Sequence, residues 1–309
     1  MEMKSRYQGA LLGLATGDAL GTTLEFKAPG TFRPLTDMTG GGPFRLPRGA
    51  WTDDTSMALC LAESLVTCGG FNAQDQMERY VRWWREGHLS SNGVCFDIGS
   101  TTARSLDRFV KTGNPFAGSA DPFAAGNGSL MRLAPVPLFF AEAPLLAVRF
   151  SADSSRTTHA AATCLDACRY YGAVIVGALN GEPKERLLAP RYTPVPDLWD
   201  REPLCAEIDA IACGSFLRKE PPAIIGSGHV VKALEAALWA FSRSSDFKDG
   251  ALLAVNLGND ADTTGAIYGQ LAGAYYGAES IPPGWRTCLA QQDLIRGFAE
   301  QLFERRIRV

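Results

Sequence analysis

Two short acidic segments, far apart in the chain, carry the residues best suited to chemistry. They are Thr52-Asp53-Asp54 and Asp260-Ala261-Asp262-Thr263. Each segment places carboxylates close together and beside a threonine hydroxyl. Neighbouring carboxylates repel one another unless a cation neutralises them, and carboxylate and hydroxyl oxygens are the ligands that hard cations prefer. The segments therefore predict a site for Mg²⁺ or Mn²⁺. Four aspartates, with Glu25, are enough ligands for two ions, and two such ions can together activate a water.

Helix capping is the simpler interpretation of the same segments. Threonine, aspartate and asparagine are favoured N-caps, and acids in the first turn suit the helix dipole. An apolar helical pattern follows each segment, so both lie where a helix is expected to begin. Asp53-Asp54 and Asp260-x-Asp262 nevertheless carry more negative charge than a cap needs. This excess favours the metal site.

Zinc is a poor match for the sequence. The chain has eight cysteines but no CxxC pair, and none of its three histidines is placed to complete a site with Cys164 and Cys168. Disulfides are also not expected, because the chain is long and no secretion signal is seen. We therefore interpret the cysteines as free thiols.

Helical periodicity dominates the elements that must position these acids, and alternating strand patterns are scarce. The sequence predicts an all-α fold, with residues 1–309 in a single domain. The segment 181–203 is rich in proline and charge, and we interpret it as an ordered excursion within that domain. The predicted helices span residues 6–24, 54–67, 74–86, 99–111, 143–151, 158–180, 202–216, 228–243, 247–256, 262–277 and 287–305.

Two of these helices carry glycine at every fourth position. Glycine lies at 9, 13, 17 and 21 in the first and at 265, 269, 273 and 277 in the penultimate one. Each set therefore lies along one helical face. Glycine costs up to about 1 kcal/mol relative to alanine in a helix interior, so eight such positions need a reason. We expect both helices to pack closely in the core, and we propose that they pack against each other.

Composition narrows the class of protein. Hydrophobic residues make up 46% of the chain and charged residues 20%, which is ordinary for a soluble globular protein. The net charge is -3 and there is no basic stripe, which argues against a nucleic-acid partner except as a modified substrate. No apolar run approaches the roughly 20 residues that a membrane span needs. The expected location is cytoplasmic.

Several motifs, taken in order, resemble those of the ADP-ribosylglycohydrolase family, and look most like its bacterial dinitrogenase reductase-activating branch. The resemblance covers most of the chain, from Gly9 to about Gly277. One such motif alone would be weak evidence for the family, but the whole set in this order is specific for it. The motifs are Gly13-x-Ala15-x-Gly17-Asp18-Ala19-Leu20-Gly21 with Glu25, Thr52-Asp53-Asp54-Thr55, Phe96-Asp97-Ile98-Gly99, Gly126-Asn127-Gly128-Ser129-Leu130-Met131-Arg132, Thr158-His159, and Asn259-Asp260-Ala261-Asp262-Thr263.

This resemblance implies a single compact, multi-helix orthogonal bundle with a dinuclear Mg²⁺ or Mn²⁺ site. It also implies a hydrolase that removes ADP-ribose from modified proteins or small conjugates. In the bacterial branch the bond cleaved is usually the N-glycosidic bond to arginine. A metal-activated water would attack the anomeric carbon of the distal ribose. The implied metal ligands are Thr52, Asp53, Asp54, Asp260, Asp262 and Thr263, and the implied catalytic groups are Glu25, Asp54, Asp97 and Asp262.

The expected substrate contacts each have a structural alternative. The loop Gly126-Asn127-Gly128-Ser129 would offer N–H groups to a diphosphate, although a lone glycine-rich loop is often only a turn. Asp97 would touch the distal ribose and move protons, or cap a helix. His159 would face ADP-ribose, or be structural. Phe123 and Phe26 would sandwich adenine or ribose, or pack in the core. His229 stands where relatives often have tyrosine, and we expect it at the mouth of the site.

Three other functions remain open from the residues alone. Isoprenoid synthases also use aspartates on helices, but their usual DDxxD motif fails here because Met57 stands at the fifth position. A non-catalytic relative would bind ADP-ribose or act structurally, although such relatives normally lose the acidic motifs. A hydrolase could also act on serine, nucleic-acid or small-molecule conjugates. The sequence does not identify the modified target, the preferred metal or the oligomeric state.

Overall fold

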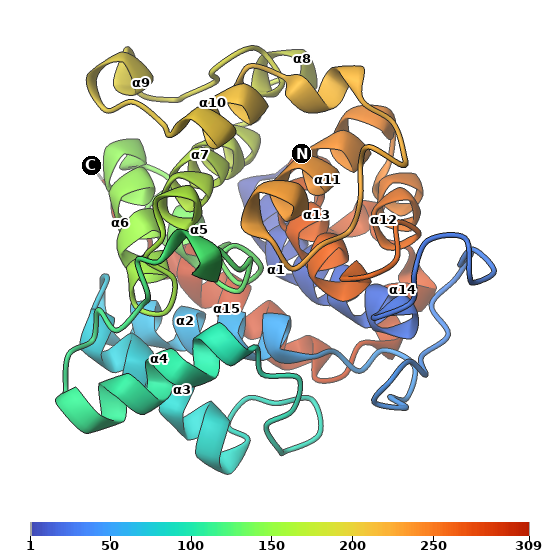
Figure 1. The fold of residues 1–309 in the computed structure, drawn as a ribbon, viewed down its shortest axis with the longest axis horizontal. Helices are drawn as coiled ribbons and strands as arrows, with labels where there is room; N and C mark the ends of the chain where they lie inside the picture. The colour runs from blue at the N-terminus through green and yellow to red at the C-terminus, as the bar shows by residue number, and fades with distance from the viewer. Residues whose placement is uncertain (1, 309) are drawn as a thin grey trace.

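Helices and their connections make up all of the chain that the computed structural model describes, residues 2–308 (Figure 1). No β-strand is present in this range, which confirms the all-α prediction. The α-helices are α1 (Met3–Gly21), α2 (Asp53–Cys68), α3 (Ala73–Glu86), α4 (Ser100–Thr112), α5 (Pro135–Phe139), α6 (Pro144–Arg156), α7 (Ala162–Leu179), α8 (Lys184–Leu187), α9 (Leu198–Arg201), α10 (Ala206–Ala212), α11 (Val230–Arg243), α12 (Phe247–Val255), α13 (Ala261–Tyr276), α14 (Pro283–Cys288) and α15 (Gln292–Arg305). Short 3₁₀ turns η1 (Thr22–Leu24), η2 (Pro122–Ala124), η3 (Ser215–Arg218) and η4 (Ala278–Ser280) link some of them.

The predicted helical segments all contain helices, but several boundaries differ. Helix α7 begins at Ala162 rather than at residue 158, so the Thr158-His159 pair precedes it. The segment predicted at 202–216 is divided, because Gly214 adopts a φ of 85° between α10 and η3. The segment 181–203 contains α8 and α9, as expected for an ordered excursion.

Helices α1 and α13 form the centre of the fold and make the most extensive contact of any helix pair. Every residue from Gly9 to Gly21 is buried, and so is every residue from Ala261 to Ala274. A helix that is buried on all sides must be apolar or small on all sides. Figure 1 shows the two helices surrounded by other elements, among them α7, α11, α12 and α15.

Glycine is what lets these two axes come together. A Cβ atom on Gly9, Gly13 or Gly17 would overlap the carbonyl oxygen of a glycine in α13, and the reverse holds for Gly265 and Gly269. The proposed pairing of the two glycine faces is therefore confirmed. Because α1 leads into Glu25 and α13 follows Asp260, this packing brings Glu25 close to the second acidic segment.

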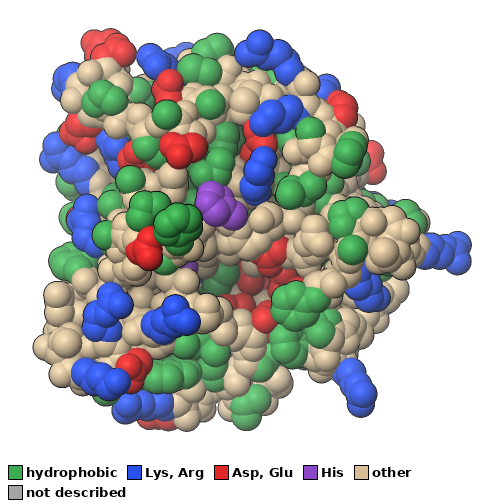
Figure 2. All heavy atoms as spheres, viewed as in Figure 1, with side chains coloured by type: hydrophobic (Ala, Val, Ile, Leu, Met, Phe, Trp, Pro, Cys, Tyr) green, Lys and Arg blue, Asp and Glu red, His purple; other side chains and the backbone are tan. Residues whose placement is uncertain are grey.

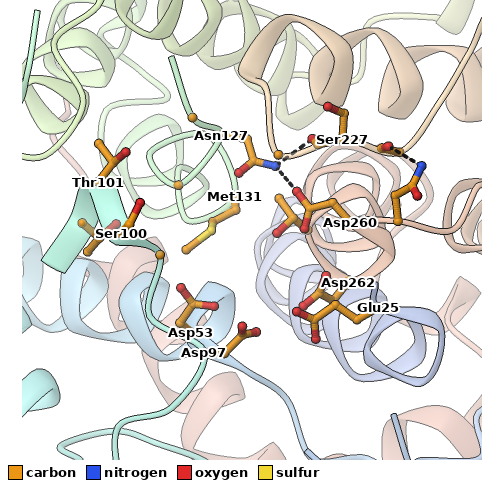
Figure 3. A pocket seen from close by; sticks show the side chains of 18 of the residues that line it. Glu25, Asp53, Asp97, Ser100, Thr101, Asn127, Met131, Ser227, Asp260 and Asp262 are labelled. Atoms are coloured by element: carbon orange, nitrogen blue, oxygen red, sulfur yellow. Dashed lines mark hydrogen bonds between the residues drawn. The ribbon is translucent and has the colours of Figure 1, made fainter. Parts of the chain in front are cut away.

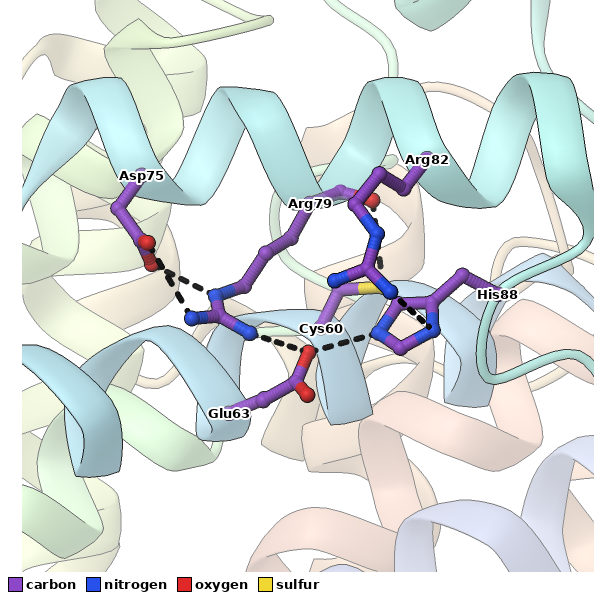
Figure 4. A network of polar contacts seen from close by, with 6 residues as sticks. All are labelled: Cys60, Glu63, Asp75, Arg79, Arg82 and His88. Carbon is purple, nitrogen blue, oxygen red and sulfur yellow. Dashed lines mark hydrogen bonds and ion pairs between the residues drawn. The ribbon is translucent and has the colours of Figure 1, made fainter.

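A polar network joins α2 to α3 (Figure 4). Arg79 Nε lies 2.6 Å from Asp75 Oδ2, and Arg79 Nη1 lies 2.5 Å from Glu63 Oε2. His88 Nε2 lies 2.7 Å from the same Glu63 oxygen. Because His88 directly follows α3, the network holds the point at which the chain leaves α3 toward Asp97.

Within residues 2–308, no helix is both long enough and apolar enough to span a lipid bilayer.

Candidate functional site

A cavity of about 780 Å³ opens on the face shown in Figure 2, where acidic side chains are visible at the bottom of a hollow. Its walls come from segments spread along the whole chain. Of the candidate site residues from the sequence, eleven line it: Glu25, Phe26, Asp53, Asp97, Gly126, Asn127, Gly128, His159, Asp260, Asp262 and Thr263.

Asp18 fixes the first acidic segment from below. Its Oδ1 accepts hydrogen bonds from the backbone N–H and the hydroxyl of Thr52, both at 2.9 Å. Its Oδ2 accepts from the N–H of Thr55 at 3.1 Å and from its hydroxyl at 2.6 Å. One buried carboxylate thus sets the start of α2. Asp18 lies in one of the sequence motifs, but its role could not be predicted, because nothing near it in the sequence indicates which backbone groups it contacts.

The carboxyl groups converge beneath the cavity in two overlapping clusters. Asp18, Asp54 and Asp262 each offer an oxygen within 4.8 Å of the others, and so do Glu25, Asp97 and Asp262. Figure 3 shows Glu25 beside Asp262, with Asp53 and Asp97 opposite them. Asp262 belongs to both clusters, so α13 supplies the carboxylate that links them.

Charge in these clusters is not balanced by protein cations. Within residues 2–308, no Lys, Arg or His forms an ion pair with any of the clustered acids. Burial, followed by repulsion from neighbouring carboxylates, raises the pKa of Asp54 and Asp262 well above the usual value. Burial and the nearby Asp97 raise the pKa of Glu25 to about 9. Burial and Asp18 raise that of Asp97 to about 7.

The residues present fit a divalent cation. Three buried carboxylate oxygens, Asp54 Oδ1, Asp262 Oδ1 and Glu25 Oε2, have no hydrogen-bond partner among residues 2–308. Buried acceptors are rarely left without a partner, and buried carboxylates are normally paired or coordinate a metal. Thr52 and Thr263 add hydroxyls next to Asp54 Oδ2, at 3.2 and 3.5 Å. An all-oxygen donor set of this kind suits Mg²⁺, Mn²⁺ or Ca²⁺.

Asn127 holds the remaining acid of the second segment in place. Its Nδ2 donates to Asp260 Oδ2 at 2.6 Å and to the Ser227 carbonyl at 3.2 Å (Figure 3). This contact joins the glycine-rich loop to the start of α13 and to the segment before α11. Ser227 was not singled out from the sequence, since a serine between two glycines carries no distinctive signal.

Two backbone hydrogen bonds join the segment that follows Glu25 to Asn259. The Phe26 N–H donates to the Asn259 carbonyl at 2.6 Å, and the Asn259 N–H donates to the Lys27 carbonyl at 2.7 Å. Phe26 and Asn259 have φ values of 61° and 53°. The left-handed region is common for asparagine but rare for phenylalanine. The pair therefore holds Glu25 next to Asp260, and it keeps the Phe26 backbone in a strained conformation. Phe26 lines the cavity wall and is 71% exposed.

His159 reaches the cavity between two glycines of the 126–129 loop. A Cβ on Gly126 or Gly128 would lie 3.2 Å from His159 Nε2, and one on Gly128 would lie 2.8 Å from Cε1. The two glycines thus make room for the imidazole. Burial, followed by the charge of Arg132, lowers the pKa of His159 to about 3, so the ring is neutral at ordinary pH.

Five of the predicted residues lie outside the cavity wall. Thr52 and Asp54 are buried beneath it. The Ser129 hydroxyl faces the interior and accepts a hydrogen bond from Ser155 at 2.7 Å. Phe123 is fully exposed. His229 is exposed at the start of α11, and its backbone forms a bridge with Gly126. The roles suggested for Phe123 and His229 stay predictions.

An all-α bundle with buried carboxylates that have no cation partner in the described chain, beneath an open cavity, defines a class of helical proteins built around an acidic, metal-type site. The comparisons narrow this class. The family model described as ADP-ribosylglycohydrolase matches residues 1–308. The chain therefore belongs to the ADP-ribosylglycohydrolase family, and it is a glycohydrolase.

Individual relatives cover nearly the whole chain. It is 42% identical over 302 residues to the ADP-ribosylarginine hydrolase Tri1 of Serratia proteamaculans, covering 98% of this chain and 80% of the relative. It is 33% identical to the ADP-ribosyl-[dinitrogen reductase] glycohydrolase of Rhodospirillum rubrum, covering 92% and 90%. A solved structure of an ADP-ribosylglycohydrolase-related protein complex superposes with a TM-score of 0.87 at 44% identity, covering 99% of both chains. The family resemblance inferred from the motifs is confirmed.

Proposed function

We propose that this glycohydrolase removes ADP-ribose from arginine side chains of modified proteins, using two Mg²⁺ or Mn²⁺ ions. The observation that carries the proposal is the convergence of Glu25, Asp54, Asp97 and Asp262 beneath a cavity of about 780 Å³. A cavity of this size falls within the range of small-molecule sites. The arginine linkage is supported by the 42% identity to a protein named as an ADP-ribosylarginine hydrolase.

The cations would be held by the two acidic segments. Asp53, Asp54, Asp260 and Asp262 supply the carboxylates, and Thr52 and Thr263 supply hydroxyls. When bound, the ions would neutralise this charge, orient ribose hydroxyls and lower the pKa of a water. Asp18 serves this set indirectly, because its four hydrogen bonds fix the backbone on which Thr52 and Asp54 are carried.

Hydrolysis joins a water oxygen to the anomeric carbon of the distal ribose and breaks the carbon–nitrogen bond to the guanidine. Nearby cations would favour the ionised form of Glu25, and we assign removal of the water proton to this carboxylate, whose Oε2 has no partner in the described chain. The same proton then returns to the departing nitrogen, so the reaction consumes one water. Asp97 lies within 4.8 Å of Glu25 and Asp262, measured between carboxylate oxygens, and it would orient the ribose.

The rest of the nucleotide would lie along the glycine-rich loop. In this loop the N–H groups of Gly126 and Asn127 are already bonded to carbonyls. That of Gly128, which lines the cavity, has no partner in residues 2–308, so it remains as a donor for a diphosphate.

A panel of linkages tests this proposal. Arginine-, serine- and DNA-linked ADP-ribose are incubated with the protein in Mg²⁺, Mn²⁺ or chelator, and free ADP-ribose is measured. We expect release in either metal, fastest from arginine, and loss of release in chelator. Faster release from serine or DNA would overturn the linkage. Binding of ADP-ribose without release from any conjugate would indicate a non-catalytic relative.

A further inference from the structure

Arg132 is a fully buried cation with no carboxylate partner in the described chain. Its guanidinium lies over the ring of Tyr80, 4.5 Å from the ring centroid, and Nη1 lies 3.7 Å from Met57 Sδ. The strongest contact is from Nη2, which donates to the Thr158 hydroxyl at 2.7 Å. Burying an unpaired charge is costly, so this arginine needs a reason beyond packing.

The Thr158 hydroxyl lies between Arg132 and the neighbouring His159, within hydrogen-bond distance of both. A guanidinium can only donate, so the hydroxyl oxygen accepts from Arg132 and has one hydrogen left to give. The nearest acceptor is His159 Nδ1 at 2.8 Å, and within residues 2–308 no other acceptor lies in reach of the hydroxyl. Thr158 is fully buried. If Nδ1 carried a proton instead, the hydroxyl hydrogen would be buried without a partner, which is strongly unfavourable.

The opposite ring nitrogen faces the cavity. His159 lines the cavity wall, and its Nε2 lies beside the space left by Gly126 and Gly128. Within the described residues Nε2 has no hydrogen-bond partner, although Nδ1 and the backbone of the same residue are fully engaged. A nitrogen that is held in place on one side and unpartnered toward a cavity is placed to meet a ligand.

We infer that Arg132 and Thr158 form a relay that locks His159 in the neutral tautomer with hydrogen on Nε2, so that His159 donates a hydrogen bond to an oxygen of the bound ADP-ribose. This inference rests on the proposed function for the identity of the ligand. Arg132 and Thr158 act through His159 and are positioning residues. His159 is a ligand contact that gives a hydrogen bond without moving a proton.

The relay also explains why both glycines and the arginine of the 126–132 segment belong to one motif. The glycines leave space on both sides of the imidazole, and the arginine at the far end sets its tautomer through Thr158. A bulkier residue at 128 would displace the ring, and an uncharged residue at 132 would release the hydroxyl to accept from Nδ1. The segment is therefore required for an oriented donor as well as for its backbone.

Nitrogen NMR of the histidine rings tests the tautomer without any substrate. In uniformly ¹⁵N-labelled protein, two-bond spectra distinguish a protonated from an unprotonated ring nitrogen. The signals of His159 are recognised as those missing from His159→Gln, with His88 and His229 as internal references. We expect an unprotonated Nδ1 and a protonated Nε2 that do not change between about pH 5 and pH 8. A protonated Nδ1, or an imidazolium in this range, would overturn the inference.

A matched pair of variants tests the relay. Thr158→Val removes the hydroxyl at nearly constant volume, whereas Thr158→Ser keeps it. We expect Val to populate the Nδ1-protonated tautomer and to weaken ADP-ribose binding about tenfold, while Ser keeps the wild-type tautomer and affinity. Equal tautomers and affinities in the Val variant and the wild type would contradict the relay.

The proposed function and the relay can be contradicted separately. If wild-type protein binds ADP-ribose but does not cleave the arginine linkage, the proposed function is wrong and the relay is unaffected. If the wild type does not bind ADP-ribose at all, the identity of the acceptor is wrong. Should Thr158→Val not fold, as judged by circular dichroism, the spectrum of the wild type alone still decides the tautomer.

Discussion

At the scale of single residues, the site depends on acids that do not all have the same task. Asp18 accepts four hydrogen bonds and so cannot offer both oxygens to a cation. Asp54 and Asp262, by contrast, each keep a buried oxygen without a partner in the described chain. The number of hydrogen-bond donors around each carboxylate therefore distinguishes the acids that hold the backbone of the site in place from the acids that can bind a cation.

Replacing Asp18 by Asn tests this division. The Asn amide would place a donor where Thr52 or Thr55 also donates, and the start of α2 would shift. We expect metal affinity and activity to fall about 10- to 100-fold, which is the usual effect of removing a group that orients metal ligands. The helical content should not change. Calorimetric titration with Mn²⁺ and far-ultraviolet circular dichroism measure the two quantities. Wild-type affinity in the variant would show that Asp18 is dispensable for the site.

Residue types alone predicted the metal-type acids, since excess charge and nearby hydroxyls are visible in the sequence. They did not predict the role of Asp18, nor that Asn127 would hold Asp260. Those roles depend on contacts between residues 34 and 133 positions apart. The strained backbone at Phe26 was also not foreseen, because its cause is the pairing with Asn259.

At the scale of elements, the glycine faces of α1 and α13 set how closely Asp18 and Glu25 approach the second acidic segment. A Cβ on Gly13 would overlap the Gly269 carbonyl oxygen, and backbone on both sides limits relaxation. We expect Gly13→Ala to destabilise the fold by about 3 kcal/mol through overpacking. Urea denaturation followed by circular dichroism measures the change.

Gly297 provides the matched control. It lies inside α15, and nothing occupies the space that a Cβ would fill. Gly297→Ala should therefore stabilise the protein by about 0.5–1 kcal/mol, because alanine is the better helix former. If both alanine variants had the same free energy of unfolding, close approach would not explain the glycine faces.

The network between α2 and α3 permits a second prediction at this scale. Although burial opposes it, hydrogen bonds from His88 and Arg79 lower the pKa of Glu63, so this acid is ionised in the fold. Arg79→Met would leave Asp75 without its cation and Glu63 with His88 alone, and we expect a loss of about 1–3 kcal/mol. Arg296→Met, which breaks an exposed pair, should change the stability by less than about 0.5 kcal/mol. Equal losses in the two variants would show that the network contributes nothing special.

Long helices were predictable because their hydrophobic period extends over several turns. Helices α5, α8, α9 and α14 were missed, since at four to six residues they are too short to show a period. The start of α7 was placed too early for a related reason. Residues 158–161 fit the helical pattern, but backbone contacts with Ser119 and Ser155 hold His159 and Ala160 outside the helix.

At the scale of the whole molecule, the buried acids make stability depend on pH. Their folded pKa values lie above the unfolded values of about 4, at about 6 for Asp18, about 7 for Asp97 and about 9 for Glu25, mainly because of burial. The folded state then holds protons that the unfolded state releases. Their contribution is complete below about pH 4 and is lost as the pH rises through these folded values.

We therefore expect the metal-free protein to melt at a lower temperature near pH 9 than near pH 6. Mg²⁺ or Mn²⁺ should reduce this fall, because a cation that binds only the folded state replaces the missing protons. Thermal melts with chelator or metal across this range measure the effect, and Glu25→Gln should show a shallower dependence. A metal-free protein whose melting temperature is constant or rises toward pH 9 would contradict the electrostatic description of the site.

The central claim is that Asp54 and Asp262, joined by the packing of α1 on α13, hold the ions on which hydrolysis depends. The most direct measurement is the release of ADP-ribose from ADP-ribosylated arginine by the wild type and by Asp262→Asn, each paired with a Mn²⁺ titration. We predict that Asp262→Asn folds normally and loses metal binding and turnover together, and that chelator abolishes turnover in the wild type. Full metal-dependent turnover in Asp262→Asn, or full wild-type turnover in chelator, would contradict the account.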